Sequence, residues 1–338
     1  MEVNKIHNIN FLDNTLPDKC ANLIIADPPY FEVKGDFDFI WKSFDDYLKD
    51  VEKWAKECKR LLADNGTLFW YGHAKNIAYA QVIFDKHFNL INNLVWDKGS
   101  FMGLEESEGL RSFAPCTERI LMYGSKAQDT TGLEYVKAEF VSPNNPISIY
   151  MKEEMKIHNI TQRQIAKLFP SVTGGLTGCV HNWLNGDGRA ITKEHYEKIQ
   201  LNFDYAFQKP YDELRKEYEE LRKEYEELRK EYEELRRPFQ NYFKLQEIFR
   251  FSNEATKTGA KYDHETVKPE TLTRALILTC SRPNDLVVVP FAGSGTECAM
   301  AVKESRKTIG FEITEKHAKM SNDRVQNILC QPSLFVCS

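Results

Sequence analysis

The sequence lacks the cysteine patterns that build disulfide frameworks or zinc sites. Its 8 cysteines are scattered without a C-x-x-C pair, and none stands at ligand-like spacing from the 8 histidines. We therefore expect neither a structural disulfide nor a metal, and free thiols fit a reducing cytoplasm. The sequence also lacks a run of about 18 apolar residues and an N-terminal basic stretch followed by an apolar one. Secretion and membrane spanning are not expected.

An excess of positive charge is absent as well, although a basic patch is the usual mark of a nucleic-acid-binding protein. The formal net charge is −5, and residues 211–237 alone carry 11 acidic and 8 basic side chains. The rest of the chain is close to neutral, and a neutral chain can still gather Lys and Arg on one face. Charge therefore permits a nucleic-acid partner without predicting one.

Short apolar runs alternate with amphipathic stretches at both ends of the chain, which is typical of an α/β sheet. We expect strands at residues 23–26, 67–71, 90–96, 120–123, 286–289 and 308–313, and helices at 47–62 and 297–303. Neither end offers enough strands for a complete doubly wound sheet, so both are predicted to form one sheet. The middle of the chain would then be an insertion.

The middle of the chain has two kinds of helical pattern. Thr161 and Gln164 form a capping box, which predicts a helix at 162–169, and a second helix is expected at 176–184. From residue 211 to 237, Tyr and Leu occupy positions a and d of a heptad repeat, which predicts one long helix ended by Pro238. The predicted domains are a catalytic half at 1–145, a helical domain at 146–205, the heptad helix at 206–238 and a cofactor-binding half at 239–338.

Asp27, Pro28, Pro29 and Tyr30 directly follow the apolar run at 23–26. The Asp27 carboxylate and the Pro28 carbonyl can accept both N–H groups of an exocyclic amine and localise its lone pair, while the prolines hold these acceptors rigidly. Tyr30 offers a ring for a base rotated out of a duplex. A simple turn after a strand has the same composition, so the motif alone leaves both interpretations open.

A glycine loop follows the predicted strand at 286–289 and consists of Phe291, Ala292, Gly293, Ser294, Gly295 and Thr296. Its glycines let a ligand approach the backbone closely. The loop has no third glycine for a dinucleotide fingerprint and no Lys for a phosphate loop, which disfavours NAD and ATP. Glu312, at the end of the next strand, is placed to accept from ribose hydroxyls. Together the two motifs favour methylation of a nucleobase amine with S-adenosylmethionine.

With these two motifs in this order, the chain resembles the beta class of DNA amino-methyltransferases. This class is circularly permuted: the catalytic motif precedes the target-recognition region and the cofactor motif comes last. The resemblance covers residues 1–125 and 237–331, including the stretches 94–98, 118–121 and 264–269. It implies a Rossmann-like S-adenosylmethionine-dependent sheet, a D-P-P-Y motif of the adenine-N6 type, and Thr266 and Lys268 at the methionine end of the cofactor.

The chain departs from this family at two positions where an acid is expected to contact the cofactor. Val289 stands where the family has Asp before Pro-Phe, and Asn8 stands where it has an early Asp. Losing one charge-assisted hydrogen bond weakens binding by about 10- to 150-fold. We therefore expect cofactor binding to be weak, or compensated by other residues.

The helical domain resembles a Cro-type helix-turn-helix, with Ile165 and Trp183 as its core and the helix at 176–184 nearest DNA. Candidate phosphate or base contacts are Arg163, Lys167, His181, Asn182, Arg189 and Lys193. The alternative is a small helical packing domain. For the heptad helix, a coiled-coil homodimer and a solvated single helix both remain open, because Tyr packs less well at position a than Ile or Val.

These observations predict a site-specific enzyme that methylates N6 of adenine, flipped out of double-stranded DNA, from S-adenosylmethionine. Cytosine N4 is the alternative within the same class. A DNA-binding regulator on a degenerate methyltransferase scaffold is the alternative outside it, which Val289 and Asn8 support and the intact Asp27 opposes. RNA or protein amide methylation is disfavoured because those enzymes more often carry Asn in place of Asp27. Whether a companion restriction endonuclease exists is open.

Overall fold

In this computed structural model, residues 1–33, 38–99, 113, 116–126, 145–170, 178–185, 191–251 and 267–330 are described. The chain divides into two compact units. The sheet unit comprises residues 1–134 and 236–338, and the helical unit comprises residues 135–235. Both ends of the chain thus contribute to the sheet unit, as the strand count predicts.

The sheet unit contains an eight-stranded mixed sheet in the order β1-β8-β7-β2-β3-β5-β4-β6. Its strands are β1 Lys5–His7, β2 Ala21–Ala26, β3 Leu62–Gly72, β4 Phe88–Asp97, β5 Thr117–Ser125, β6 Ile248–Arg250, β7 Leu286–Val289 and β8 Lys307–Phe311. The pairs from β1 to β3 are parallel, whereas β5 is antiparallel to both β3 and β4. The strand expected at 308–313 ends at Phe311, which places Glu312 just beyond it.

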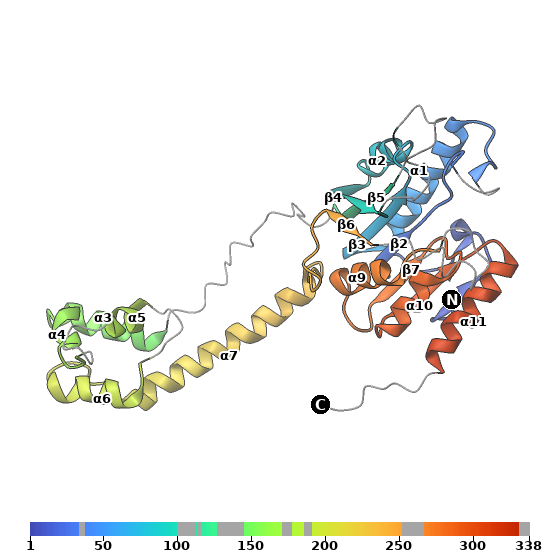
Figure 1. Ribbon diagram of the computed structural model, residues 1–338. Helices are drawn as coiled ribbons and strands as arrows, with labels where there is room; N and C mark the ends of the chain where they lie inside the picture. The colour runs from blue at the N-terminus through green and yellow to red at the C-terminus, as the bar shows by residue number, and fades with distance from the viewer. Residues whose placement is uncertain are drawn as a thin grey trace. The chain divides into compact units, whose positions relative to one another are not determined.

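Helices cover both faces of this sheet (Figure 1). They are α1 Phe44–Leu61, α2 Ile77–Phe84, α9 Glu270–Cys280, α10 Thr296–Lys303 and α11 Glu315–Leu329, with a 3-10 turn η1 at Phe11–Asp13. Alternate residues of each central strand face opposite cores, because side chains alternate along a strand. Ile24 packs on the side of α1 and α2, and Ile25 packs on the side of α9, α10 and α11.

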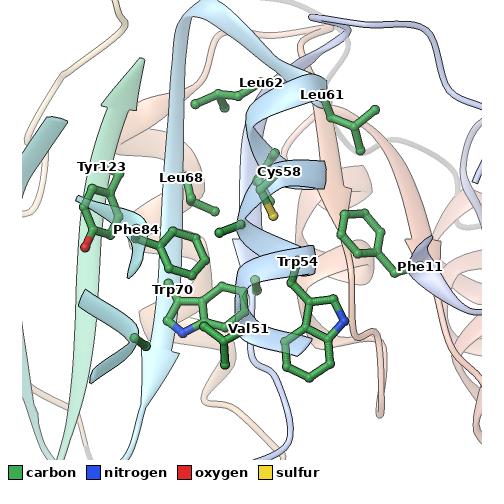
Figure 2. Packing of buried hydrophobic residues seen from close by; sticks show 14 of the residues in the cluster. Phe11, Val51, Trp54, Cys58, Leu61, Leu62, Leu68, Trp70, Phe84 and Tyr123 are labelled. Atoms are coloured by element: carbon green, nitrogen blue, oxygen red, sulfur yellow. The ribbon is translucent and has the colours of Figure 1, made fainter. Parts of the chain in front are cut away.

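The core beneath α1 is rich in aromatic side chains. Figure 2 shows Trp54 and Cys58 of α1 against Leu68 and Trp70 of β3. The ring centroids of Trp54 and Trp70 are 6.2 Å apart, and both side chains are buried. Burying a large apolar side chain contributes about 1.5–3 kcal/mol, so this cluster fixes α1 and, through Trp54, one wall of the cavity described below.

The chain reverses its direction of winding between β2 and β7. The connection from β2 through α1 to β3 runs to one side, and that from β7 through α10 to β8 runs to the other. In open α/β sheets a ligand crevice forms outside the carboxyl ends of the strands at such a switch point. The D-P-P-Y motif follows β2 and the glycine loop follows β7, so both motifs stand at this crevice.

The helical unit has a core of its own. Its helices are α3 Pro146–Ile157, α4 Gln162–Ala166, α5 Cys179–Asn185, α6 Lys193–Asn202 and α7 Tyr211–Leu235. The capping box at Thr161 and Gln164 is present, and Ile165 and Trp183 are buried as expected. Helix α4 ends at Ala166, three residues earlier than predicted, and residues 171–177 at the expected start of α5 lie outside the described residues.

The heptad repeat forms the continuous helix α7, which ends at Leu235 before Pro238. Leu214 is 1% exposed because it packs into the core of the helical unit. Further along, Leu221 is 41% exposed and Leu235 is 70% exposed. Burial of the heptad leucines within this chain thus decreases from Leu214 to Leu221 and Leu235.

In the part of the chain that the structure describes, none of the helices combines the length and apolar character needed to cross a lipid bilayer.

Candidate active site

A cavity of about 790 Å³ lies in the sheet unit at the carboxyl ends of β2 and β7. Both sequence motifs line it: Asp27, Pro28, Pro29 and Tyr30 from the first, and Phe291, Ala292, Gly293 and Ser294 from the second. Trp41 and Trp54 add aromatic walls. The cavity therefore combines apolar and charged walls, as is typical of a site for an organic ligand.

Asp27 is held by two donors. The Tyr30 hydroxyl donates to Oδ1 at 2.6 Å, and the Lys268 ammonium donates to Oδ2 at 2.5 Å. Burial, followed by the charges of Asp27 and Glu118, raises the pKa of Tyr30, which keeps its hydroxyl protonated as a donor. A carboxylate has about four lone-pair sites, so Asp27 retains acceptor capacity for a further donor.

Lys268 connects Asp27 to a second buried carboxylate. Its Nζ lies 3.6 Å from Oε2 of Glu118, and Glu118 also accepts a hydrogen bond from Lys98. Burial alone would lower the pKa of Lys268, but the charges of Asp27 and Glu118 outweigh it and raise that pKa above its usual range. Burial likewise opposes ionisation of Glu118, whereas Lys268 and Lys98 lower its pKa overall. Lys268 and Glu118 are therefore both charged at neutral pH.

The glycine loop is shaped by its glycines and by α11. Gly293 has a φ of 47° and Gly295 a φ of 72°, a left-handed conformation that glycine adopts without strain. A Cβ on Gly295 would lie 2.7 Å from the Cβ of Ser321. Arg324 of α11 donates to the Ser294 carbonyl at 3.0 Å and to Oγ1 of Thr296 at 2.8 Å. These contacts hold the loop in place.

Glu312 lines the cavity, and Asn8 supports the segment that carries it. The Glu312 carboxylate accepts from the amides of Gly293 at 2.9 Å and Thr314 at 2.8 Å. Asn8 donates through Nδ2 to the carbonyls of Glu312 and Ile313. Asn8 therefore positions the segment that follows β8, although it is not among the residues that line the cavity.

The structure brings most of the predicted site residues to one cavity. Gly295 and Thr296 support the loop from behind and do not line the cavity, and Thr266 lies outside the described residues. Val289 is 1% exposed and packs in the apolar core under α10, so it has no contact with the cavity. The candidate DNA contacts belong to the helical unit: Arg163, Lys167, His181 and Lys193 are exposed, Asn182 is half-buried, and Arg189 lies outside the described residues.

Among the charged residues at or next to the site, Lys98, Glu118, Glu297 and Arg324 receive no role from the sequence. Lys98 and Glu118 stand in stretches that match the family pattern, but the pattern does not show which residues they contact. Glu297 is the second residue of α10, where an acid is commonly explained by the helix dipole. Arg324 sits in the amphipathic helix α11, and nothing in its spacing distinguishes a buried arginine from an exposed one.

A glycine loop joining a strand to a helix, beside a carboxylate that can hold an amine, defines a group-transfer enzyme that acts on an amino group with an organic cofactor. The profile of the DNA methylase family N6_N4_Mtase matches residues 21–323, so the chain belongs to this family. Members of this family use S-adenosylmethionine as the methyl donor, and the chain is a DNA methyltransferase that depends on this cofactor.

Curated relatives are similar over most of their length. The Type II methyltransferase M1.MboII of Moraxella bovis is 24% identical over 332 residues, which is 95% of this chain and 96% of that protein. The DNA adenine methyltransferase YhdJ of Escherichia coli K12 is 25% identical over 315 residues, which is 92% of this chain and 78% of that protein. The solved structure of TTHA0409, a DNA modification methylase of Thermus thermophilus, is 16% identical with a TM-score of 0.49, covering 96% of each chain.

The residues at the cavity fit S-adenosylmethionine. Gly293, which has no side chain, lets a ligand approach the loop closely, Glu312 would take the ribose hydroxyls, and Lys268 is a buried cation for the methionine carboxylate. Oε1 of Glu297, buried in the same wall, has no hydrogen-bond partner among the described residues. When bound, the cofactor supplies a methyl group on a positively charged sulfur. The protein's part is to hold and orient the accepting amine.

Proposed function

We propose that this chain is a site-specific methyltransferase that modifies N6 of adenine in double-stranded DNA. The observation that carries the proposal is Asp27, whose carboxylate stands at the carboxyl end of β2 in the same cavity as the glycine loop. Asp27 and the Pro28 carbonyl would accept the two N–H groups of the amine, which directs its lone pair toward the methyl donor. Proximity and in-line orientation then supply most of the rate enhancement.

Tyr30 is the proposed stacking partner of the flipped base. Its ring lines the cavity next to Asp27, and its hydroxyl is already engaged by that carboxylate. Rotating an adenine out of the duplex costs a few kcal/mol, which stacking and the hydrogen bonds to its amine would offset.

The D-P-P-Y form of the motif and the similarity to a relative named a DNA adenine methyltransferase favour adenine over cytosine. The helical unit is the proposed target-recognition domain, a helix-turn-helix insertion in which α5 lies nearest the DNA. Arg163, Lys167, His181, Asn182, Arg189 and Lys193 are its proposed phosphate or base contacts. The heptad helix α7 is the proposed dimer contact, a coiled coil formed with a second copy of this chain.

The test is the identity of the methylated base. Purified protein is incubated with genomic DNA and methyl-labelled S-adenosylmethionine, and the DNA is then digested to nucleosides and separated. We expect the label in N6-methyldeoxyadenosine, lost in Asp27→Ala and kept in Asp18→Ala, which removes an exposed carboxylate paired with Arg60. Label in N4-methyldeoxycytidine would refute adenine as the target, and unlabelled DNA with retained specific binding would favour a regulator.

A further inference from the structure

The wall of the cavity contains a buried carboxylate to which no role has been given. Glu297 is 5% exposed and lines the cavity, yet its Oε1 has no hydrogen-bond partner among the described residues. Leaving a buried carboxylate oxygen unpaired is costly. A side chain retained under that cost is a candidate for contact with a ligand.

The nearby cations are already engaged by other groups. Lys268 binds Asp27 and Glu118, and Lys98 binds Glu118. Arg324 donates to the Ser294 carbonyl and to Thr296, and it pairs with Glu270 at 2.7 Å. These cations are thus held by other groups, while Oε1 of Glu297 has no hydrogen-bond partner among the described residues. A positive group on a ligand in the cavity would pair with it.

S-adenosylmethionine carries two positive groups at its methionine end, the α-ammonium and the sulfonium. We propose that Glu297 binds this cationic end and that its carboxylate compensates for the acids missing at Val289 and Asn8. Val289 is packed in the apolar core away from the cavity, whereas Glu297 directly follows the glycine loop and lines the ligand space. Glu297, in the first turn of α10, stands 8 residues after Val289, the position at the end of β7 where the family has its acid.

Ionisation of Glu297 is coupled to binding in this arrangement. Burial and then the Asp27 charge raise the pKa of Glu297 to about 7, while Lys268 and Arg324 oppose the rise. Among the described residues, the phenol of Tyr71 and the thiol of Cys298 also interact with its charge. A bound cation favours the carboxylate, so below pH 7 the free protein holds a proton on Glu297 that it must release when the cofactor binds.

The experiment is isothermal titration of the full-length protein with S-adenosylmethionine at pH 6 in two buffers of different ionisation enthalpy. We expect the wild type to release up to one proton per bound cofactor, and to bind more tightly at pH 7.5 than at pH 6. Glu297→Gln should release none and bind at least about tenfold more weakly at pH 7.5. Glu304→Gln, which removes a carboxylate at the far end of α10, should behave like the wild type.

Titration with S-adenosylhomocysteine separates the two cationic groups, since it keeps the ammonium and lacks the sulfonium charge. If Glu297→Gln weakens the binding of both ligands equally, the partner of Glu297 is the ammonium. If it weakens only the binding of S-adenosylmethionine, the partner is the sulfonium. Wild-type binding without proton release at pH 6, or unchanged affinity of a folded Glu297→Gln protein, would overturn the proposal. Because neither titration involves DNA, the proposal stands or falls separately from the choice of adenine.

Discussion

Asp27, Lys268 and Glu118 form a chain of alternating charges across the base of the cavity. The chain fixes the orientation of Asp27, so an arriving amine meets an acceptor that needs no rearrangement. Fixed acceptors of this kind stabilise a reacting geometry better than mobile ones do. Oε2 of Glu118 also has no hydrogen bond among the described residues, but it lies 3.6 Å from the Lys268 ammonium. Oε1 of Glu297 likewise has no hydrogen-bond partner there, and the ionisation of Glu297 depends on pH and on the ligand.

Glu297 should make the stability of the ligand-free protein depend on pH. Its carboxyl ionises near pH 4.5 when unfolded and near 7 when folded, so the folded state binds the proton more tightly. The wild type therefore loses stability as the pH rises from about 4.5 to 7, by about 2 to 3 kcal/mol. Glu297→Gln removes this loss. The free energy of unfolding of the variant, measured in urea relative to that of the wild type, should therefore be higher at pH 8 than at pH 5 by this amount.

The comparison requires that other groups titrate alike in both proteins. Glu304→Gln serves as the control, because it removes a carboxylate from the C-cap of the same helix, where it pairs with Arg274 outside the cavity. A difference between Glu297→Gln and wild type that stayed constant from pH 5 to pH 8 would show that Glu297 is ionised throughout, contrary to our account.

Helix α7 is the element whose sequence and surroundings fit least well within one chain. Leu221 and Leu235 occupy heptad positions d and remain exposed. Burying such a leucine contributes about 1.5–3 kcal/mol, which a second copy of α7 would provide. The segment also forms ion pairs along its own surface, such as Arg222 with Glu226 at 3.0 Å, and these add only a few tenths of a kcal/mol each.

Replacing a heptad leucine should dissociate the proposed dimer. We expect the wild type to sediment as a dimer at micromolar concentration. Leu221→Gln should raise the dissociation constant of the dimer at least about tenfold. Lys223→Gln, at the outward position f, should leave the dimer intact. Wild-type protein that sediments as a monomer at all accessible concentrations would rule out the coiled coil.

Helix α4 supplies the clearest test of DNA recognition by the helical unit. Arg163 on α4 and Lys167 at its C-cap are exposed. If both contact phosphates, the steepness of log affinity against log salt should fall by about 1.8 in the double alanine variant. Fluorescence anisotropy on duplex DNA at several salt concentrations measures this slope. Lys216→Ala on α7 is the control. An unchanged slope would mean that α4 does not contact the DNA backbone.

Much of the sheet unit follows from the sequence because its strands are apolar runs bounded by turn residues. Strands β2 and β7, which precede the two motifs, are found at the expected residues. They pair in one sheet, as predicted. The three-residue strands β1 and β6 were not predicted, because so short a segment carries no periodicity. The antiparallel orientation of β5 was not predicted either, since orientation depends on pairing and not on local pattern.

Part of the site also follows from the sequence, and part of it needs the structure. Asp27, Tyr30 and the glycine loop are contiguous motifs, so the sequence reveals them. Glu118 and Lys268 are 150 residues apart in the chain, and only the fold brings them to Asp27. The environment of Glu297 depends on Lys268 binding Asp27 and Arg324 binding Thr296. The spacing of these residues in the sequence does not predict those contacts. Partnerships between distant charges are the part of the site that needs a structure.

Along the sequence, the helical unit is inserted between the two segments that form the sheet unit, and the sheet unit contains the candidate active site. Because the two halves of the sheet are joined through β2 and β7, neither half holds a complete cavity. The insertion therefore places a proposed recognition unit in the same chain as the site without interrupting β2, β7 or the loops that follow them.

Methylome sequencing of DNA from cells that express this protein or its Asp27→Ala variant tests adenine methylation and the role of Asp27 together. We expect N6-methyladenine at one sequence motif in the first sample and none at that motif in the second, because Asp27 is the acceptor that holds the amine. Methylation of cytosine N4 at a motif, or adenine methylation that persists in the Asp27→Ala variant, would contradict the account.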